Sequence, residues 1–304
     1  MMTNIRRIRR QAFTLVELLV VIAIIAILAG LASWAVIAMV GTQSARNTDN
    51  TIKAVNKVLQ TQWKFVIDEA KKDDISGNAA LQALAAPDPD GSRAQVLWIK
   101  LRLMEAFPQS YAEISSPWVY SADPSGNPYI PVGQRRYNVS YLKSFTTPPF
   151  VAANNQAVTQ SSACLLIALS VSKGGSVLSS DQIGFATDDA DKDGVKELTD
   201  GWHHPIGFTR FTLAPNPATA GPGLKFADPV DPLGTLLNAS WYASPTAYLG
   251  TDNARATFEK KAGYLISPDN GANANYVTYG IASAGKDGVP GTADDIISFK
   301  LRLD

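Results

Sequence analysis

Three aspartates separated by single residues precede Gly194 in one short segment of the chain. Calcium prefers six to eight hard oxygen ligands, and a tight Asp-x-Asp-x-Asp-Gly turn directs alternate carboxylates inward. The spacing therefore predicts a cation site. The candidate ligands, at positions 1, 3, 5, 9 and 12 of this pattern, are Asp189, Asp191, Asp193, Glu197 and Asp200.

This segment departs from a complete helix–loop–helix calcium unit. Asp200 stands at position 12, where a longer, bidentate Glu is usual. Residues 201–205, Gly-Trp-His-His-Pro, follow, so no helix is expected behind the loop. A solvated acidic turn is the alternative to a calcium site.

Other residue types offer little chemistry. His203 and His204 are the only histidines, and adjacent side chains on an extended segment point in opposite directions, so one shared metal is not expected. Cys164 is the only cysteine, which excludes an intramolecular disulfide, and the apolar run around it predicts a core thiol on a buried strand. The sequence has no nucleophile elbow, phosphate-binding loop or His-Glu-x-x-His motif. No catalytic residues are therefore predicted.

Size and charge limit the classes of function. The chain has 304 residues, with 27 basic and 27 acidic side chains. Four of the basic side chains lie within the first twelve residues, so the remaining chain has 23 basic against 27 acidic side chains. A basic surface for nucleic acid is therefore not expected. The four early arginines are Arg6, Arg7, Arg9 and Arg10.

A long apolar segment follows these arginines. Residues 18–40 contain no charged side chain and are long enough to cross a bilayer as one helix. The basic cluster would stay on the cytoplasmic side, which places the rest of the chain outside. Glu17 is the only charged residue between Arg10 and Arg46. A carboxylate there is costly in lipid, which indicates a function for Glu17.

The segment from Ala12 to Ala29, Ala-Phe-Thr-Leu-Val-Glu and then apolar residues, resembles the type IV prepilin signal of type IV pilins and type II secretion pseudopilins. The resemblance implies that a prepilin peptidase cuts between Ala12 and Phe13 and then methylates the new amino terminus. The family usually has Gly before the cut, and Ala is also small. The resemblance further implies that Glu17 pairs with the methylated Phe13 of a neighbouring subunit during filament assembly.

Two other interpretations fit parts of the N-terminus. A secretory signal also has a basic start and an apolar core, but its core is shorter and its cut lies after the core. A plain membrane anchor fits the length. Neither interpretation explains Glu17, so the prepilin signal is the prediction.

A second Asp/Gly loop lies near the C-terminus, over residues 282–296. It resembles the calcium loop of major pseudopilins, which precedes the last strand of the head. The resemblance implies that Asp287, Asp294 and Asp295 bind calcium with help from backbone carbonyls. The alternative is a Gly-rich hairpin connection whose acids lie in water.

Hydrophobic periodicity predicts the elements that would position these residues. Apolar residues recur at spacings of three and four from Ile52 to Ala70, and no proline interrupts residues 1–86, so one continuous helix is expected over 13–72. The run at 163–171 fits a strand or a helix equally. Shorter helices are expected at 79–85 and 94–107, and strands at 206–213, 264–267, 276–282 and 295–303.

The chain is therefore expected to be α+β and pilin-like, with the long N-terminal helix packed under a C-terminal antiparallel sheet. The expected parts are a leader at 1–12, the long helix at 13–72 with its transmembrane part at 13–40, an unassigned helix- and loop-rich part at 73–180, and a β-rich head at 181–304.

Residues and resemblance together predict a non-enzymatic subunit of a type II secretion pseudopilus or a type IV pilus-like filament. It would span the bacterial inner membrane once, with its head in the periplasm. Its partners would be other pilin-like subunits, prepilin peptidase and inner-membrane lipid, and its cofactor calcium. The alternatives are an adhesive or DNA-uptake pilin and a membrane-anchored extracytoplasmic enzyme.

Overall fold

The structure is a computed structural model. It describes residues 15–86, 88, 90–115, 121–122, 128–129, 137–143, 145, 157–184, 186–215, 230–231 and 275–298. The chain divides into two compact units, Met1–Ser44 and Ala45–Asp304.

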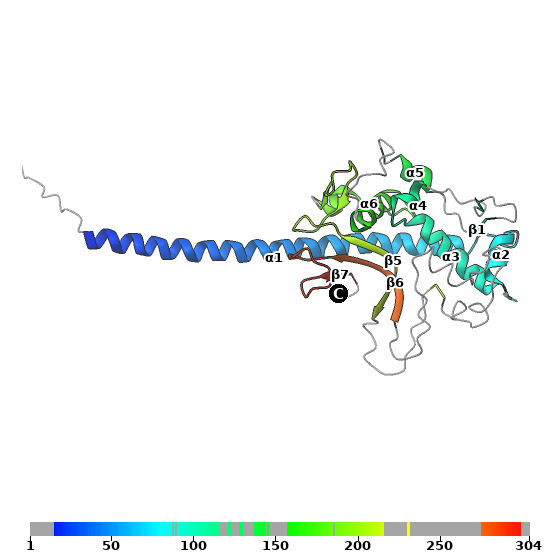
Figure 1. Ribbon diagram of the computed structural model, residues 1–304, viewed down its shortest axis with the longest axis horizontal. Helices are drawn as coiled ribbons and strands as arrows, with labels where there is room; N and C mark the ends of the chain where they lie inside the picture. The colour runs from blue at the N-terminus through cyan, green and yellow to red at the C-terminus, as the bar shows by residue number, and fades with distance from the viewer. Residues whose placement is uncertain are drawn as a thin grey trace, which may run out of the picture. The chain divides into compact units, whose positions relative to one another are not determined.

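Helix α1 runs from Leu15 to Ala70 without interruption, which confirms the long N-terminal helix (Figure 1). In the first unit, Leu15–Ser33 is long and apolar enough, by length and composition, to cross a membrane. Its large apolar side chains are 43–78 % exposed in the single chain. A helix that is apolar all round has to be covered by lipid or by other helices.

Within the second unit, α1 is amphipathic and buries one face in the core. The fully or nearly fully buried apolar positions recur every three, four or seven residues, as the sequence predicts. Trp63 and Ile67 are partly buried against the same core. The apolar residues of this segment that are at most 2 % exposed are Ile52, Val55, Leu59, Val66 and Ala70.

Short helices build much of the rest of the second unit. Helix α2 occupies the range that the sequence predicts, and the side chain of Asn78 caps its first turn by accepting from the Leu81 backbone N–H at 3.0 Å. Helix α3 matches the predicted helix at 94–107. The helices are α2 (Ala79–Ala85), α3 (Ser92–Ala106), α4 (Tyr111–Ser115), α5 (Asn138–Leu142), α6 (Ala157–Ser170) and α7 (Ser180–Ile183).

Cys164 lies on helix α6, so of the two elements that fit the run at 163–171 the helix is confirmed, and the buried strand predicted around Cys164 is wrong. The polar residues before the apolar run, Thr159, Ser161 and Ser162, are buried as well and belong to the same helix. Because α6 is buried on most of its surface, its apolar run has no polar face, and periodicity alone cannot distinguish it from a buried strand.

Among the described residues, the strands form three antiparallel sheets. The largest has the order β5-β6-β7, with Phe208 opposite Ile281 and a bulge between Thr209 and Thr212 (Figure 1). Its first two strands confirm the predictions at 206–213 and 276–282. The strands are β1 (Ser121–Ala122), β2 (Pro128–Tyr129), β3 (Thr187–Asp188), β4 (Glu197–Leu198), β5 (Gly207–Pro215), β6 (Asn275–Ser283) and β7 (Ile296–Ile297).

Two of the predicted strands fall wholly or partly outside the described residues. The one at 264–267 lies outside them entirely. The one at 295–303 appears as β7, and residues 299–304 lie outside the described part. The confirmed strands and α1 together give the α+β, pilin-like arrangement that the sequence predicts.

The second half of α1 contacts both the helices and the sheet. Trp63 stacks on Phe107 with ring centroids 5.1 Å apart, and its ring lies 5.0 Å from that of Tyr279 on β6. Gln62 is buried on α1, and its Nε2 donates to the carbonyls of Leu169 and Ser176 at 3.2 and 2.9 Å. These bonds join α1 to the turn after α6.

Lys173 lies in that turn and is itself buried. Its Nζ donates to Gln62 Oε1 at 3.1 Å and lies 5.1 Å from the ring centroids of Phe107 and Tyr137. Burial lowers the pKa of Lys173 to about 7. The turn is therefore fixed against α1 by hydrogen bonds and by aromatic rings around the amine.

The same turn provides a test of packing against α1. Gly174 and Gly175 both have positive φ, +61° and +77°, but only a Cβ on Gly174 would meet Phe65, at 2.8 Å from Cδ2. Gly175→Ala should cost about 1–2 kcal/mol of unfolding free energy through backbone strain alone. Gly174→Ala should cost about 1–3 kcal/mol more through overpacking. Chemical denaturation of the full chain in detergent measures both, and equal losses would contradict this packing.

Candidate functional site

The N-terminal motif begins before the described residues. Ala12 and Phe13, the predicted processing residues, lie outside them. Glu17 lies in the first turn of α1 and is exposed in the single chain. The N-terminal end of a helix carries partial positive charge, which favours a carboxylate at this position.

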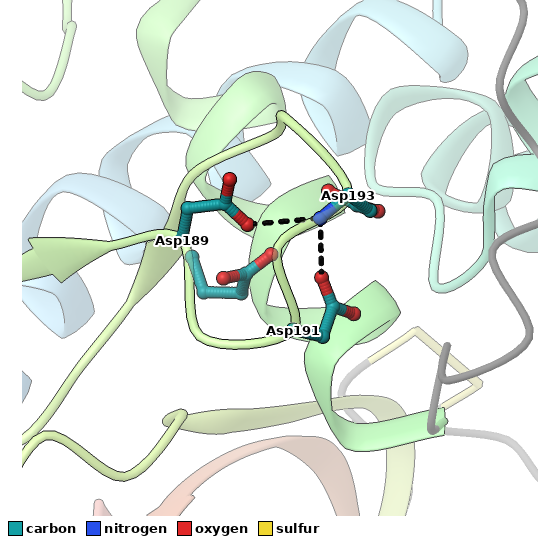
Figure 2. A group of neighbouring side chains, drawn as sticks. Asp189, Asp191 and Asp193 are labelled. Atoms are coloured by element: carbon teal, nitrogen blue, oxygen red, sulfur yellow. Dashed lines mark hydrogen bonds between the residues drawn. The ribbon is translucent and has the colours of Figure 1, made fainter.

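The first acidic loop connects β3 to β4. These two strands pair antiparallel, with Asp188 opposite Glu197, and so bring the two ends of the loop together. Four carboxylates each offer an oxygen, and these oxygens all lie within 4.8 Å of one another. Figure 2 shows the carboxylates of Asp189 and Asp191 directed toward the backbone N–H of Asp193. The four residues are Asp189, Asp191, Asp193 and Glu197.

Backbone N–H groups hold the loop in this conformation. The N–H of Asp193 donates to Asp189 Oδ1 at 3.1 Å and to Asp191 Oδ1 at 3.3 Å (Figure 2). Gly194 has φ +89° and donates to Asp189 Oδ2 at 3.1 Å. The glycine after the third aspartate is thus needed for a left-handed backbone turn.

Glu197 is the most buried carboxylate of the group, with no exposed surface. Its Oε2 accepts from the Ala190 N–H at 2.7 Å. Its Oε1 has no hydrogen-bond partner among the residues that the structure describes. Burial, and then the negative charges of the nearby aspartates, raise the pKa of Glu197 to about 7. Two ionised carboxylates of this group whose oxygens lie 4.8 Å apart, the upper limit of the separation in the group, repel each other by about 3.5 kcal/mol at an effective dielectric constant of about 20.

Tyr111 fixes the group from a distant part of the chain. Its hydroxyl, on α4, donates to Asp193 Oδ2 at 2.9 Å. Burial, and then the hydrogen bond to Asp193, raise the pKa of Tyr111. Because these two residues are far apart in the sequence, loop spacing alone gives no signal for this contact.

Asp200, the predicted twelfth-position ligand, lies outside this group. Its carboxylate is buried, and its Oδ2 accepts from the Ser283 hydroxyl at 2.6 Å. Its Oδ1 accepts from the N–H groups of Trp202 and His204 at 2.8 and 2.9 Å. Asp200 therefore holds the following turn against β6.

The two histidines contact different groups. Nδ1 of the exposed His203 is 3.9 Å from Asp188 Oδ2. Nδ1 of His204 lies 2.9 Å from the carbonyl oxygen of Gly285.

The second Asp/Gly loop connects β6 to β7, as the sequence predicts for the loop before the last strand. Asp294 Oδ2 accepts from the Lys286 and Asp287 N–H groups at 2.7 and 3.2 Å. Hydrogen bonding, first from the Thr292 hydroxyl, lowers the pKa of Asp294. A Cβ on Gly285, which has φ +66°, would lie 2.5 Å from the Asp294 carbonyl oxygen, so this loop also requires a glycine.

Calcium binding by this second loop stays a prediction. Asp287 and Asp294 are exposed, and their carboxylates accept hydrogen bonds from the loop itself. Asp295 Oδ2 accepts from the Gly291 N–H at 2.7 Å. Asp295 Oδ1 is buried and has no hydrogen-bond partner within the described part of the chain, which leaves one oxygen that a cation would satisfy.

Cys164 is buried on α6 and is a free thiol. Burial raises the pKa of Cys164 well above its usual value. The thiol is therefore protonated, and its environment is that of a core side chain rather than of a nucleophile.

Comparison with known families identifies a motif in the N-terminal part of the chain. The family model "Prokaryotic N-terminal methylation motif" matches residues 7–33. The chain carries a prepilin methylation motif. The motif supports a type IV pilin-like family and implies processing by prepilin peptidase and assembly with other pilin subunits. Comparisons with curated proteins and with solved structures gave no match.

The environment of Asp200 provides a test of its structural role. Asp200→Ala should lower the unfolding free energy by about 2–3 kcal/mol, because three donors lose their acceptor inside the protein. The control is Asp188→Ala, which removes an exposed carboxylate from the β3–β4 hairpin. It should change the unfolding free energy by less than about 0.5 kcal/mol. Denaturant unfolding of both full-length variants measures the difference. An equally small loss in the two variants would contradict the role assigned to Asp200.

Proposed function

We propose that this chain is a non-enzymatic structural subunit of a type II secretion pseudopilus or a related type IV pilus-like filament. The observation that carries the proposal is the methylation motif at 7–33, which overlaps the start of a helix whose first part is apolar and whose second part is buried in a head. A filament subunit needs both parts: the apolar segment packs in the filament core, and the buried segment supports the head.

Processing is the first step of the proposed function. A prepilin peptidase would cut between Ala12 and Phe13 and methylate the new amino terminus. The four arginines would keep the leader on the cytoplasmic side, so the head would lie in the periplasm, across the inner membrane. Removing the leader leaves a positively charged amino terminus immediately before the apolar helix.

Assembly is the second step. In a filament, the apolar segment Leu15–Ser33 would leave lipid and pack against the same segment of neighbouring subunits. Glu17 would be buried in this step, and the methylated amino terminus of Phe13 on a neighbour carries the opposite charge. A buried carboxylate is tolerated when such a partner is present.

The second Asp/Gly loop favours the pseudopilus over other filaments. It connects the paired strands β6 and β7, and the resemblance in sequence implies a calcium loop just before the last strand of the head. We propose calcium binding at Asp287, Asp294 and Asp295, supported by the buried, unpartnered Oδ1 of Asp295 among the described residues. The part of the head at 73–180, which the resemblance does not cover, sets this chain apart from a typical major subunit.

Processing gives a prediction about mass. Protein extracted from membranes of cells with an active prepilin peptidase should begin at N-methylated Phe13, because Ala12 is small enough for the peptidase site. Ala12→Gly should be processed at least as well, and Ala12→Leu should accumulate the precursor. Intact-mass spectrometry measures all three. A wild-type chain that keeps its leader, or that is cut after the apolar segment, would refute the prepilin interpretation.

Assembly gives a prediction about Glu17. Glu17→Ala should be cleaved and inserted normally, because removing a carboxylate lowers the cost of insertion, by at most about 2.5–3.5 kcal/mol for a residue at the end of the helix. The same variant should enter filaments poorly, because the charge that pairs with Phe13 is gone. Quantifying subunit in sheared filament fractions measures this effect.

A matched control for Glu17 lies on the same helix. Ser33 is a polar residue of the same apolar segment, and its hydroxyl donates to the Ala29 carbonyl at 2.8 Å within the helix. Ser33→Ala should therefore assemble normally. Normal filament yield from Glu17→Ala would remove the role proposed for the carboxylate.

A further inference from the structure

We propose that the β3–β4 loop is a calcium site whose ligands are Asp189, Asp191, Asp193 and Glu197. Its residues belong neither to the methylation motif nor to the β6–β7 loop, and the site does not depend on the proposed filament function. It also differs from the site that the spacing alone predicts, because Asp200 is engaged elsewhere.

The first argument is convergence. Oxygens from four carboxylates lie within 4.8 Å of one another, close enough to contact one ion between them (Figure 2). All four ligand groups are hard oxygens, and calcium accepts six to eight such ligands at 2.3–2.6 Å in flexible geometry. Backbone carbonyls and water would complete the coordination. Magnesium requires near-ideal octahedral geometry at shorter distances and suits this group less well.

The second argument is Glu197, which points to a ligand independently of the aspartates. It comes from strand β4, its side chain has no exposed surface, and it is directed into the group. Its Oε1 has no hydrogen-bond partner within the described ranges. A buried polar atom without a partner is costly, and a buried carboxylate is normally paired or bound to a metal. A cation between the four carboxylates would satisfy this oxygen.

The third argument is that the loop is held in place before any ion binds. Tyr111 on α4 fixes Asp193 at 2.9 Å, and the Ala190 N–H fixes the second oxygen of Glu197 at 2.7 Å. Lys192 has φ +62° and Gly194 φ +89°, so the turn accepts two left-handed residues. A non-glycine residue at positive φ is strained and persists when surrounding contacts fix it.

The test uses the full chain in detergent. Asp294→Asn and Asp295→Asn are combined to remove acidic ligands from the β6–β7 loop, and this double variant is the background for the other variants. The background should bind about one calcium per chain in equilibrium dialysis. Adding Glu197→Gln should weaken calcium binding by about 10- to 100-fold or more, since even residues behind the ligands contribute that much. Adding Asp188→Asn instead should leave binding unchanged, because Asp188 is an exposed acid next to the group and not part of it.

Thermal unfolding of the same variants separates binding from structure. In chelator, Glu197→Gln should melt at a higher temperature than the background, because a buried negative charge has been removed. In millimolar calcium the order should reverse, because the background is stabilised by the bound ion. The proposal is overturned if the background binds no calcium. It is equally overturned if Glu197→Gln binds calcium as tightly as the background, or lowers the melting temperature by the same amount in calcium and in chelator.

Discussion

The apolar surface of α1 has to be removed from water, and this requirement governs how the rest of the chain is built. From Leu15 to Ser33 the large apolar side chains are more than two-fifths exposed in the single chain, so their cover comes from outside the subunit. From Ile52 to Ala70 the apolar face of the same helix is buried within the second unit. At about 25 cal/mol per Å² of apolar surface, both kinds of cover are strongly favourable. One helix thus supplies an anchor and a support for the head.

Polar contacts between residues far apart in the sequence complete the head. Gln62 and Lys173 join α1 to the turn after α6, and Asp200 joins the β4 end to Ser283 on β6. Arg210 is buried and forms a two-bonded ion pair with Glu113 at 2.6 and 3.0 Å. Such groups stabilise a single arrangement because each would be costly to bury alone. Both Asp/Gly loops begin or end beside these contacts, and this keeps their carboxylates in defined positions.

The sequence predicts most where a pattern is local. The period of three and four in α1, the helix at 79–85 and the strands at 206–213 and 276–282 are confirmed because periodicity and breakers act over short distances. The run around Cys164 does not distinguish a strand from a helix, because a helix buried on most sides has no polar face. At the acidic loop, spacing identifies the alternating aspartates and Glu197 but also includes Asp200, which binds Ser283 instead. Tyr111 could not be predicted, because its contact with Asp193 depends on how α4 packs against the hairpin.

In the proposed filament, the exposed apolar segment of α1 becomes the core. Cryo-electron microscopy of filaments formed when the chain is expressed with its prepilin peptidase and assembly machinery tests this claim most directly. We expect Leu15–Ser33 to lie in the filament interior, packed against the same segment of neighbouring subunits, with Glu17 next to an adjacent amino terminus. A processed chain that enters no filament under these conditions and stays as single subunits in the lipid fraction would contradict the account.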